Sequence, residues 1–109
     1  MKIVFIGFAT AYKSTVGQAV AKELGLPFVD TDVLAESYAG KSIAEIFSQD
    51  GEDSFRQAES AVLKSIAADN VVVACGGGTP LAKGFDEFCK GAVVVWLKVD
   101  ASSVAERLG

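Results

Sequence analysis

Runs of apolar residues and stretches with helical periodicity alternate along this chain. Three runs rich in β-branched residues, 2–6, 70–75 and 92–97, have the length and composition of strands buried on both faces of a sheet. A shorter run, Phe28-Val29, leads into Asp30 and predicts one further strand. Four strands separated by helical segments predict an α/β fold, in which a parallel sheet with right-handed crossovers carries helices on both faces.

Helical spacing of apolar residues locates the connecting elements. We expect helices over 13–24, 33–39, 43–49 and 52–68, and a weaker helix or irregular connection over 81–90. The helix over 52–68 presents an apolar face made of Phe55, Ala58, Val62, Leu63 and Ile66.

The remaining segments are assigned from turn and cap signals. Residues 7–12 are expected to form a loop, and Trp96 is expected in the core. A capping box, Ser42-Ile43-Ala44-Glu45, starts the helix over 43–49, and a second one, Ser103-Val104-Ala105-Glu106, starts a helix near the end of the chain.

Composition indicates a single globular domain over residues 1–109. At this length, with half its residues hydrophobic, the chain can bury one core but not two. Lys or Asp interrupts every apolar run before it reaches the length of a membrane span, and Met1-Lys2 leads into the first strand without a signal-peptide pattern. We therefore expect a cytoplasmic protein with no membrane partner.

Charge and residue usage exclude several function classes. The net charge of −4 and the sequence pI near 4.7 argue against a nucleic-acid partner, because binding to a phosphate backbone needs clustered Lys and Arg. The chain has no histidine, so acid–base chemistry falls to carboxylates. Cys75 and Cys89 are too few for a zinc site and are interpreted as reduced, partly buried thiols.

A phosphate-binding loop is indicated directly after the first strand. The P-loop pattern is a glycine, four residues, a second glycine, Lys and then Ser or Thr. Gly7, Lys13 and Ser14 fit this pattern, whereas Tyr12 occupies the position of the second glycine. The alternative is an ordinary strand-turn-helix connection that happens to carry Lys-Ser-Thr.

Two further segments follow strands and carry polar or flexible residues. Asp30 and Asp32 could assist a Mg²⁺ ion and accept a proton, or could simply form a turn and a helix N-cap. The run 76–78 is three consecutive glycines, which favours close approach of a ligand to the backbone. Because ligands of open parallel sheets bind beyond the carboxyl ends of the strands, segments 7–15, 30–32 and 76–79 are expected to form one site.

One arginine is also a candidate for ligand binding. Arg56 lies in the first half of the helix over 52–68, and its guanidinium suits a carboxylate ligand. A surface ion pair with Glu52 or Glu59 is the equally simple alternative.

Taken together, these segments resemble the shikimate kinase family. The shared patterns are Ile-Gly-Phe-x-x-x-x-Lys-Ser-Thr-Val-Gly at 6–17, Pro-Phe-x-Asp-Thr-Asp at 27–32, Gly-x-Ser-Ile-Ala-Glu-Ile-Phe at 40–47, Gly-Glu-x-x-Phe-Arg-x-x-Glu at 51–59 and Gly-Gly-Gly at 76–78. The resemblance implies a three-layer P-loop-kinase fold with strand order 2-3-1-4. It also implies transfer of the γ-phosphate of ATP to the 3-hydroxyl of shikimate, with Mg²⁺, in aromatic amino-acid biosynthesis.

The resemblance also implies roles for individual residues. Lys13 would stabilise the transferring phosphoryl group, and Asp32 would bind the substrate hydroxyls and act as the base. Mg²⁺ would be held by Ser14 and, through water, by Asp30. Shikimate would be bound by Asp32, Arg56, Gly77 and Gly78, and the nucleotide by Gly7, Ala11, Tyr12, Lys13, Ser14 and Thr15.

This chain departs from the family pattern in two respects. The family has glycines where this chain has Thr10 and Tyr12, and a left-handed residue with a side chain costs about 1–2 kcal/mol, so nucleotide binding is expected to be weakened. Family members also continue well beyond 109 residues, into an arginine-bearing lid, a fifth strand and an adenine-binding loop. The domain is therefore expected to be incomplete at its C-terminus, and the fourth strand could pair with another chain as a homodimer.

Two alternatives to an active shikimate kinase stay open from the sequence. One is a shikimate kinase-like binding module that has lost productive nucleotide binding. The other is a different small-molecule P-loop kinase, acting for example on gluconate or a nucleoside, against which Arg56 and the three glycines argue.

Overall fold

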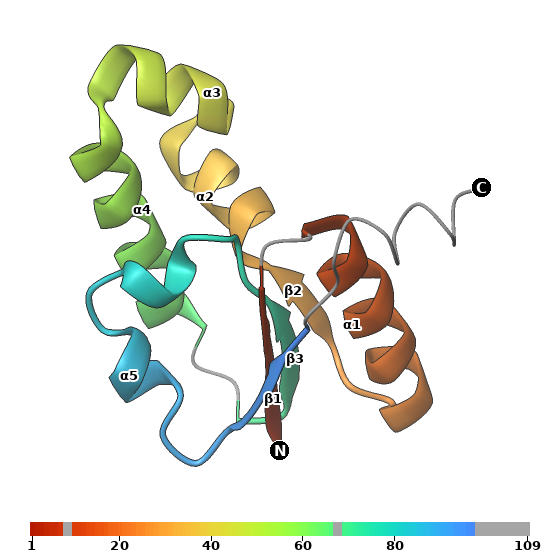
Figure 1. The fold of residues 1–109 in the computed structure, drawn as a ribbon. Coiled ribbons are helices and arrows are strands. Elements are labelled where there is room, and N and C mark those ends of the chain that lie inside the picture. The colour runs from red at the N-terminus through yellow and green to blue at the C-terminus, as the bar shows by residue number, and fades with distance from the viewer. Residues whose placement is uncertain (8–9, 67–68, 98–109) are drawn as a thin grey trace.

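Four parallel strands form the centre of the molecule. The structure, a computed structural model, describes residues 1–7, 10–66 and 69–97 (Figure 1). The strands lie in the order β2-β3-β1-β4, with bounds β1 Lys2–Ile6, β2 Phe28–Asp30, β3 Val71–Ala74 and β4 Val93–Trp96. The predicted fold class and strand order are confirmed.

Helices cover both faces of the sheet, because alternate residues of β1 point to opposite sides. Ile3 and Phe5 pack with Ala21 of α1 (Thr10–Leu24) on one face. Val4 packs on the other face with Leu63 and Phe88, which belong to α4 (Glu52–Ser65) and α5 (Phe85–Phe88). Figure 1 shows α1 on one side of the strands and α4 and α5 on the other.

A further group of helices extends from the sheet. It contains α2 (Thr31–Ala39), α3 (Ile43–Glu45) and the π-helical turn η1 (Ile46–Asp50). These elements pack against α4 through Ala35, Ile46 and Phe55, which are all buried. The capping box predicted at Ser42 is present, and the short 3₁₀ turn η2 (Thr79–Leu81) precedes α5.

Three helix boundaries differ from the predictions. Helix α1 begins at Thr10 instead of Lys13 or Ser14, because Tyr12 takes helical geometry where the P-loop pattern has glycine. Helix α2 begins at Thr31 instead of Val33, because the Asp30 side chain caps it directly at the end of β2. Helix α4 ends at Ser65 instead of about Ala68, because Ile66 leaves the helical region and packs against the core on both sides of α4.

The expectation that Trp96 is a core residue is wrong. Trp96 is 61% exposed, and Val93 and Val94 in the same strand are also exposed. Strand β4 is at the edge of the sheet, and it pairs only with β1 among the strands that the structure describes. The predicted capping box at 103–106 lies outside the described residues.

The interpretation of the two cysteines as partly buried thiols is supported. Cys75 is buried, Cys89 is half-buried, and both are free thiols. Within the described ranges, no helix combines the length and apolar character that crossing a membrane requires.

Candidate functional site

The three polar segments predicted from the sequence meet at one edge of the sheet. Gly7 follows the carboxyl end of β1, Asp30 is the last residue of β2, and Gly76 lies two residues after β3. These three strands are neighbours in the sheet, so their carboxyl ends lie side by side (Figure 1). The sheet therefore brings the segments together as expected for a parallel α/β fold.

The segment after β1 differs from the predicted loop over 7–12. Helix α1 already includes Thr10, Ala11 and Tyr12, so the second half of the expected loop is helical. No described residue other than glycine has a positive φ, and Tyr12 accordingly keeps helical geometry where the P-loop pattern has glycine. Gly7 does need to be glycine, since its φ is +139° and a Cβ would overlap the Leu97 carbonyl oxygen.

Lys13 is completely buried in the first part of α1. Its ammonium group donates a hydrogen bond to the Gly7 carbonyl oxygen, which spans the turn between β1 and α1. Burial lowers the pKa of Lys13, while the neighbouring charges of Asp32 and Asp30 act in the opposite direction. The Lys13 ammonium group is thus held beside the turn between β1 and α1, near the carboxylates of Asp30 and Asp32.

Ser14 and Asp30 form a direct contact between α1 and β2. The Ser14 hydroxyl donates to Asp30 Oδ2 at 2.7 Å. The other oxygen, Oδ1, accepts from the backbone N–H of Asp32 at 2.9 Å and of Val33 at 3.4 Å, which caps α2. One oxygen of Asp30 therefore has the predicted N-cap role, whereas its other oxygen accepts from Ser14 and its metal-binding role stays a prediction.

Asp32 lies against the glycine run after β3. A Cβ on Gly76 would overlap the Asp32 carboxylate, so this glycine is required by the close approach of a side chain. Burial raises the pKa of Asp32, and the nearby Asp30 and Glu59 charges raise it further against the opposing effect of Lys13. A raised pKa makes this carboxylate a stronger proton acceptor than an ordinary aspartate.

Arg56 reaches the same glycine run from α4. Its Nη1 donates to Glu59 Oε1 at 2.6 Å and to the Gly78 carbonyl oxygen at 2.9 Å, and its Nη2 pairs with Glu52 at 3.4 Å. A Cβ on Gly78 would overlap the guanidinium group. Arg56 forms the ion pairs that one interpretation expected, and it also lies beside the glycine run, whereas its binding of a carboxylate ligand stays a prediction. Gly77, between the two crowded glycines, is exposed.

A buried polar chain connects these two sides of the site. Glu59 is 1% exposed, and its second oxygen, Oε2, accepts from the Thr79 hydroxyl at 2.7 Å. Thr79 and Thr31 lie 3.3 Å apart, and Thr31 accepts from the Gly76 N–H at 3.0 Å. Because Thr79 gives its proton to Glu59, Thr31 must donate to Thr79. The chain of hydrogen bonds runs from Gly76 through both threonines to Glu59 and ends at Arg56.

Sequence reasoning missed the structural importance of Glu59, Thr31 and Thr79. A signal for Glu59 was available, because it follows Phe55 by four residues and thus lies on the apolar face of α4. An acid on a buried face needs a charged or hydrogen-bonding partner. For the two threonines the sequence carries no comparable signal, because their contact joins residues 48 positions apart.

The donor set at Ser14 and Asp30 fits a hard divalent cation. Hydroxyl and carboxylate oxygens suit Mg²⁺, which keeps several waters and needs few protein ligands. Among the described residues, no three His, Cys, Asp or Glu side chains are grouped so that they could hold a metal ion. For the nucleotide phosphates, the described backbone offers the first turn of α1, from Thr10 to Lys13, with Ser14 and Thr15 in the turn that follows.

Comparison with known proteins gives the same family by three routes. The family model for shikimate kinase matches residues 10–109. Shikimate kinases from Mycobacterium marinum and Rhodococcus jostii are each 40% identical to this chain over 99% of its length. The chain covers 59% and 65% of those two proteins, so it spans about 60% of the length of the relatives it matches.

Solved structures agree with the sequence relatives. Shikimate kinase from Acinetobacter baumannii, in complex with shikimate, matches with a TM-score of 0.86 and 34% identity over 97% of this chain and 60% of that protein. The Aquifex aeolicus shikimate kinase matches with a TM-score of 0.83 and 36% identity, over 94% of this chain and 62% of that protein. A gluconokinase from Sinorhizobium meliloti has a TM-score of 0.62 and 24% identity, over 98% of this chain and 62% of that protein, and shows a shared fold only. On the strength of the family model and these relatives, the chain belongs to the shikimate kinase family.

Proposed function

We propose that this chain carries the acceptor side of a shikimate kinase, and that the protein transfers the γ-phosphoryl group of ATP to the 3-hydroxyl of shikimate. The observation that carries the proposal is the position of Asp32 and Arg56 against the glycines of the same run, with Glu59 connecting Arg56 to Gly76 through the hydroxyls of two threonines. This arrangement offers a carboxylate-binding guanidinium group and a proton-accepting carboxylate at one place. The shikimate bound to the related Acinetobacter baumannii enzyme supports the choice of substrate.

In this proposal each side chain has a separate task. Arg56 binds the substrate carboxylate with the part of its guanidinium group that Glu59 leaves available. Asp32 orients the substrate hydroxyls and accepts the proton of the attacking one, which its raised pKa favours. Gly77 and Gly78 bring backbone groups close to the substrate.

The donor side of the reaction falls to α1 and β2. Lys13 stabilises the negative charge of the transferring phosphoryl group, and Ser14 with Asp30 holds the metal ion. Bound Mg²⁺ and ATP would supply the phosphoryl group and neutralise its oxygens. The chain's own contribution is positioning and electrostatic stabilisation, as is general for phosphoryl transfer.

Isothermal titration calorimetry with shikimate tests the acceptor side directly. We expect saturable binding to the native chain, and a loss of at least tenfold in affinity in Arg56→Lys, which keeps the charge but loses the planar fork. Lys41→Arg, in a residue paired with Asp50 away from the site, should bind shikimate like the native chain. Absence of shikimate binding both with and without Mg·ATP would contradict the proposal.

One observation favours a second candidate, a shikimate-binding module without productive nucleotide binding. Helix α1 begins at Thr10, within the segment that forms the phosphate loop in the P-loop pattern. Release of ADP in the presence of shikimate and Mg·ATP separates the two candidates. Shikimate binding with turnover supports the kinase, and shikimate binding without turnover supports the module.

A further inference from the structure

A second pocket lies away from the proposed substrate site, on the face formed by α4 and α5. It has a volume of about 370 Å³, which falls in the range of small-molecule sites. One of its lining residues, Lys2, is the first residue of β1, whereas the substrate site lies beyond the other end of that strand. From Lys2 to Ile6 the strand spans about 13 Å, so the Lys2 end of the pocket is remote from the substrate site. The other end, with Lys64 and Lys83, adjoins a second hollow that Arg56 also lines.

The lining of this pocket has an unusual charge for this protein. The whole chain has a net charge of −4, with ten basic residues. Four of those ten, Lys2, Lys64, Lys83 and Lys90, line the pocket, and Glu87 is the one acid among the lining residues. A cationic pocket in an acidic protein indicates an anionic ligand.

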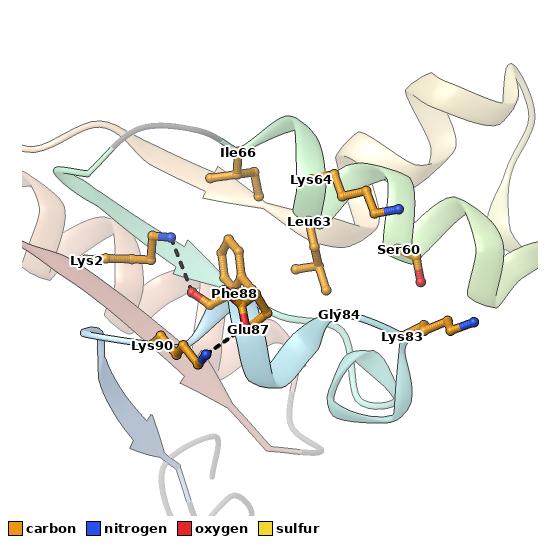
Figure 2. Close-up of a pocket in the computed structure, with 10 residues that line it drawn as sticks. All are labelled: Lys2, Ser60, Leu63, Lys64, Ile66, Lys83, Gly84, Glu87, Phe88 and Lys90. Carbon is orange, nitrogen blue, oxygen red and sulfur yellow. Dashed lines mark hydrogen bonds and ion pairs between the residues drawn. The ribbon is translucent and has the colours of Figure 1, made fainter.

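The two ends of the pocket differ in whether their lysine ammonium groups already have partners (Figure 2). At one end, Lys2 donates to the Phe88 carbonyl oxygen at 3.3 Å and Lys90 pairs with Glu87 at 3.0 Å. At the other end are Lys64 and Lys83, and neither ammonium group forms a hydrogen bond or ion pair with any described residue. The ammonium groups that can still take a partner therefore lie at the second end, beside the Ser60 hydroxyl.

An apolar surface separates these ends. Figure 2 shows Leu63 and the ring of Phe88 between the two groups of lysines. The Lys2 ammonium lies over the Phe88 ring, 4.1 Å from its centroid. An aromatic ring of a ligand could pack on Leu63 and on the part of the Phe88 ring that Lys2 leaves uncovered, with an attached anion reaching Lys64 and Lys83. The volume of the pocket, the unpaired lysines at one end only and the apolar surface between the ends together favour a small aromatic carboxylate over a nucleotide or a polyanion.

We propose that the pocket between α4 and α5 is a second ligand site, which binds a small aromatic carboxylate with its carboxylate on Lys64 and Lys83 and its ring on Phe88 and Leu63. This site does not rest on the proposed function, since none of these four residues belongs to the proposed substrate site. Helix α4 nevertheless carries Arg56 as well as Lys64, so both sites share one rigid element.

Titration of the ¹⁵N-labelled chain with 3-phenylpropionate, followed by NMR, tests this site. We expect saturable shifts centred on the amides of Ser60, Lys64 and Gly84, with affinity in the millimolar range or tighter. The uncharged 3-phenylpropionamide and the ring-free acetate should each bind at least tenfold more weakly, because each lacks one half of the recognition. Inorganic phosphate should not compete with the probe at equal concentration.

Matched variants distinguish binding in the pocket from a general effect of the net charge of the protein. Lys64→Ala/Lys83→Ala should weaken binding of 3-phenylpropionate about tenfold. Lys22→Ala/Lys41→Ala makes the same change in net charge outside the pocket, and Lys22, like Lys64, is in the last turn of its helix. This control pair should change the affinity less than twofold.

Several results would overturn the inference. One is an equal loss of affinity for 3-phenylpropionate in both double variants, and another is equal affinity for the amide and the carboxylate probes. A third is a set of NMR shifts that change with protein concentration in the absence of the probe, which would indicate a second copy bound to this face. Arg56→Lys should leave binding of 3-phenylpropionate unchanged. Loss of the probe in that variant would place it in the substrate site and contradict a second site, whereas failure of shikimate binding alone would contradict only the proposed function.

Discussion

At the residue scale, the site depends on buried polar groups that satisfy one another. Lys13, Thr31, Glu59 and Thr79 are all buried, and no buried side-chain nitrogen or oxygen lacks a partner in the part of the chain that the structure describes. A buried polar group without a partner is costly, so removing one member of such a network affects the others. The arrangement thereby holds Arg56 against the glycine run, through Glu59 and the Gly78 carbonyl oxygen.

Thr79→Val tests whether this network positions Arg56. Valine keeps the shape of the side chain but leaves Glu59 Oε2 without its donor and the Thr31 hydroxyl without its acceptor, which should lower the free energy of unfolding by about 1–3 kcal/mol. We also expect weaker shikimate binding, because Glu59 holds Arg56 less firmly. Urea denaturation and calorimetry measure the two effects.

The control for this variant is Ser37→Ala, which removes an exposed hydroxyl from α2. It should change the free energy of unfolding by less than about 0.5 kcal/mol. If Thr79→Val is as stable as Ser37→Ala and binds shikimate like the native chain, the network has no positioning role.

Cys75 gives a prediction about pH. Burial raises the pKa of the Cys75 thiol to about 12. Between its ordinary pKa near 9.0 and this value, the native chain keeps a proton that the unfolded chain releases, so this thiol makes the native state less stable as pH rises. At pH 8 the native thiol is almost entirely neutral and should resist alkylation.

Mass spectrometry after treatment with iodoacetamide at pH 8 checks this expectation. Cys75 should stay unmodified in the native chain and react in urea, while the half-buried Cys89 should react faster than Cys75 without denaturant. Equal native labelling of both thiols would mean that Cys75 is accessible.

At the element scale, the sequence predicted the strands better than the helix boundaries. The strands could be found because each is a short, apolar, β-branched run, and the face of α4 could be found because Phe55, Ala58 and Val62 repeat with helical spacing. Boundaries such as the start of α2 depend on one side chain, Asp30, which serves a strand and a helix at once. That double use is visible only when β2 and α2 are in place.

The meeting of the site segments could also be predicted, but their contacts could not. Parallel strands bring their carboxyl ends to one edge, which follows from topology alone. The glycine run was expected to make room for a ligand, whereas Gly76 and Gly78 make room for the side chains of Asp32 and Arg56. These are tertiary contacts between distant segments, so local spacing does not report them.

Asp30 allows its structural and metal-binding roles to be separated. Asp30→Asn keeps an oxygen that can accept from the N–H groups of Asp32 and Val33, so the chain should unfold at nearly the native urea concentration. Asp30→Ala loses this cap and should lose about 1 kcal/mol of stability. Both variants should lose the Mg²⁺ dependence of nucleotide binding, because both lack the carboxylate that faces Ser14.

Urea denaturation and nucleotide titration with and without Mg²⁺ measure these outcomes. Nucleotide binding that still strengthens with Mg²⁺ in Asp30→Asn would place the metal away from Asp30. Equal stability of the Ala and native chains would show that the cap contributes nothing measurable.

At the scale of the whole molecule, one edge of the sheet is open to solvent among the described residues. Strand β4 exposes Val93, Val94 and Trp96, although the strand was expected in the core. The apolar run alone could not reveal this, because whether such a strand is central or at an edge depends on what pairs with it. Pairing of two copies through this edge stays a prediction.

Trp96 reports on this edge, because it is the only tryptophan in the chain. With 61% of the residue exposed, its fluorescence should be strongly quenched by acrylamide in dilute solution. Quenching should decrease as protein concentration rises if copies pair through β4. A blue-shifted, poorly quenched emission in dilute solution would contradict the exposed position.

We propose that the acceptor side of a shikimate kinase is present, and that the adjacent phosphate-binding segment is impaired because α1 extends into it as far as Thr10. Titration of Mg·ATP into the native chain and into Thr10→Gly/Tyr12→Gly tests this claim most directly. Ala11→Gly is the matched control, because it weakens the same helical turn by about 1 kcal/mol without restoring a family glycine.

We predict at least tenfold tighter nucleotide binding in the double glycine variant than in either the native chain or Ala11→Gly, with unchanged shikimate affinity. Glycines at both positions remove a conformational cost of about 1–2 kcal/mol at each, and 1.4 kcal/mol corresponds to a factor of ten. Nucleotide affinity that is already high in the native chain, or that does not rise in the double variant, would contradict the account.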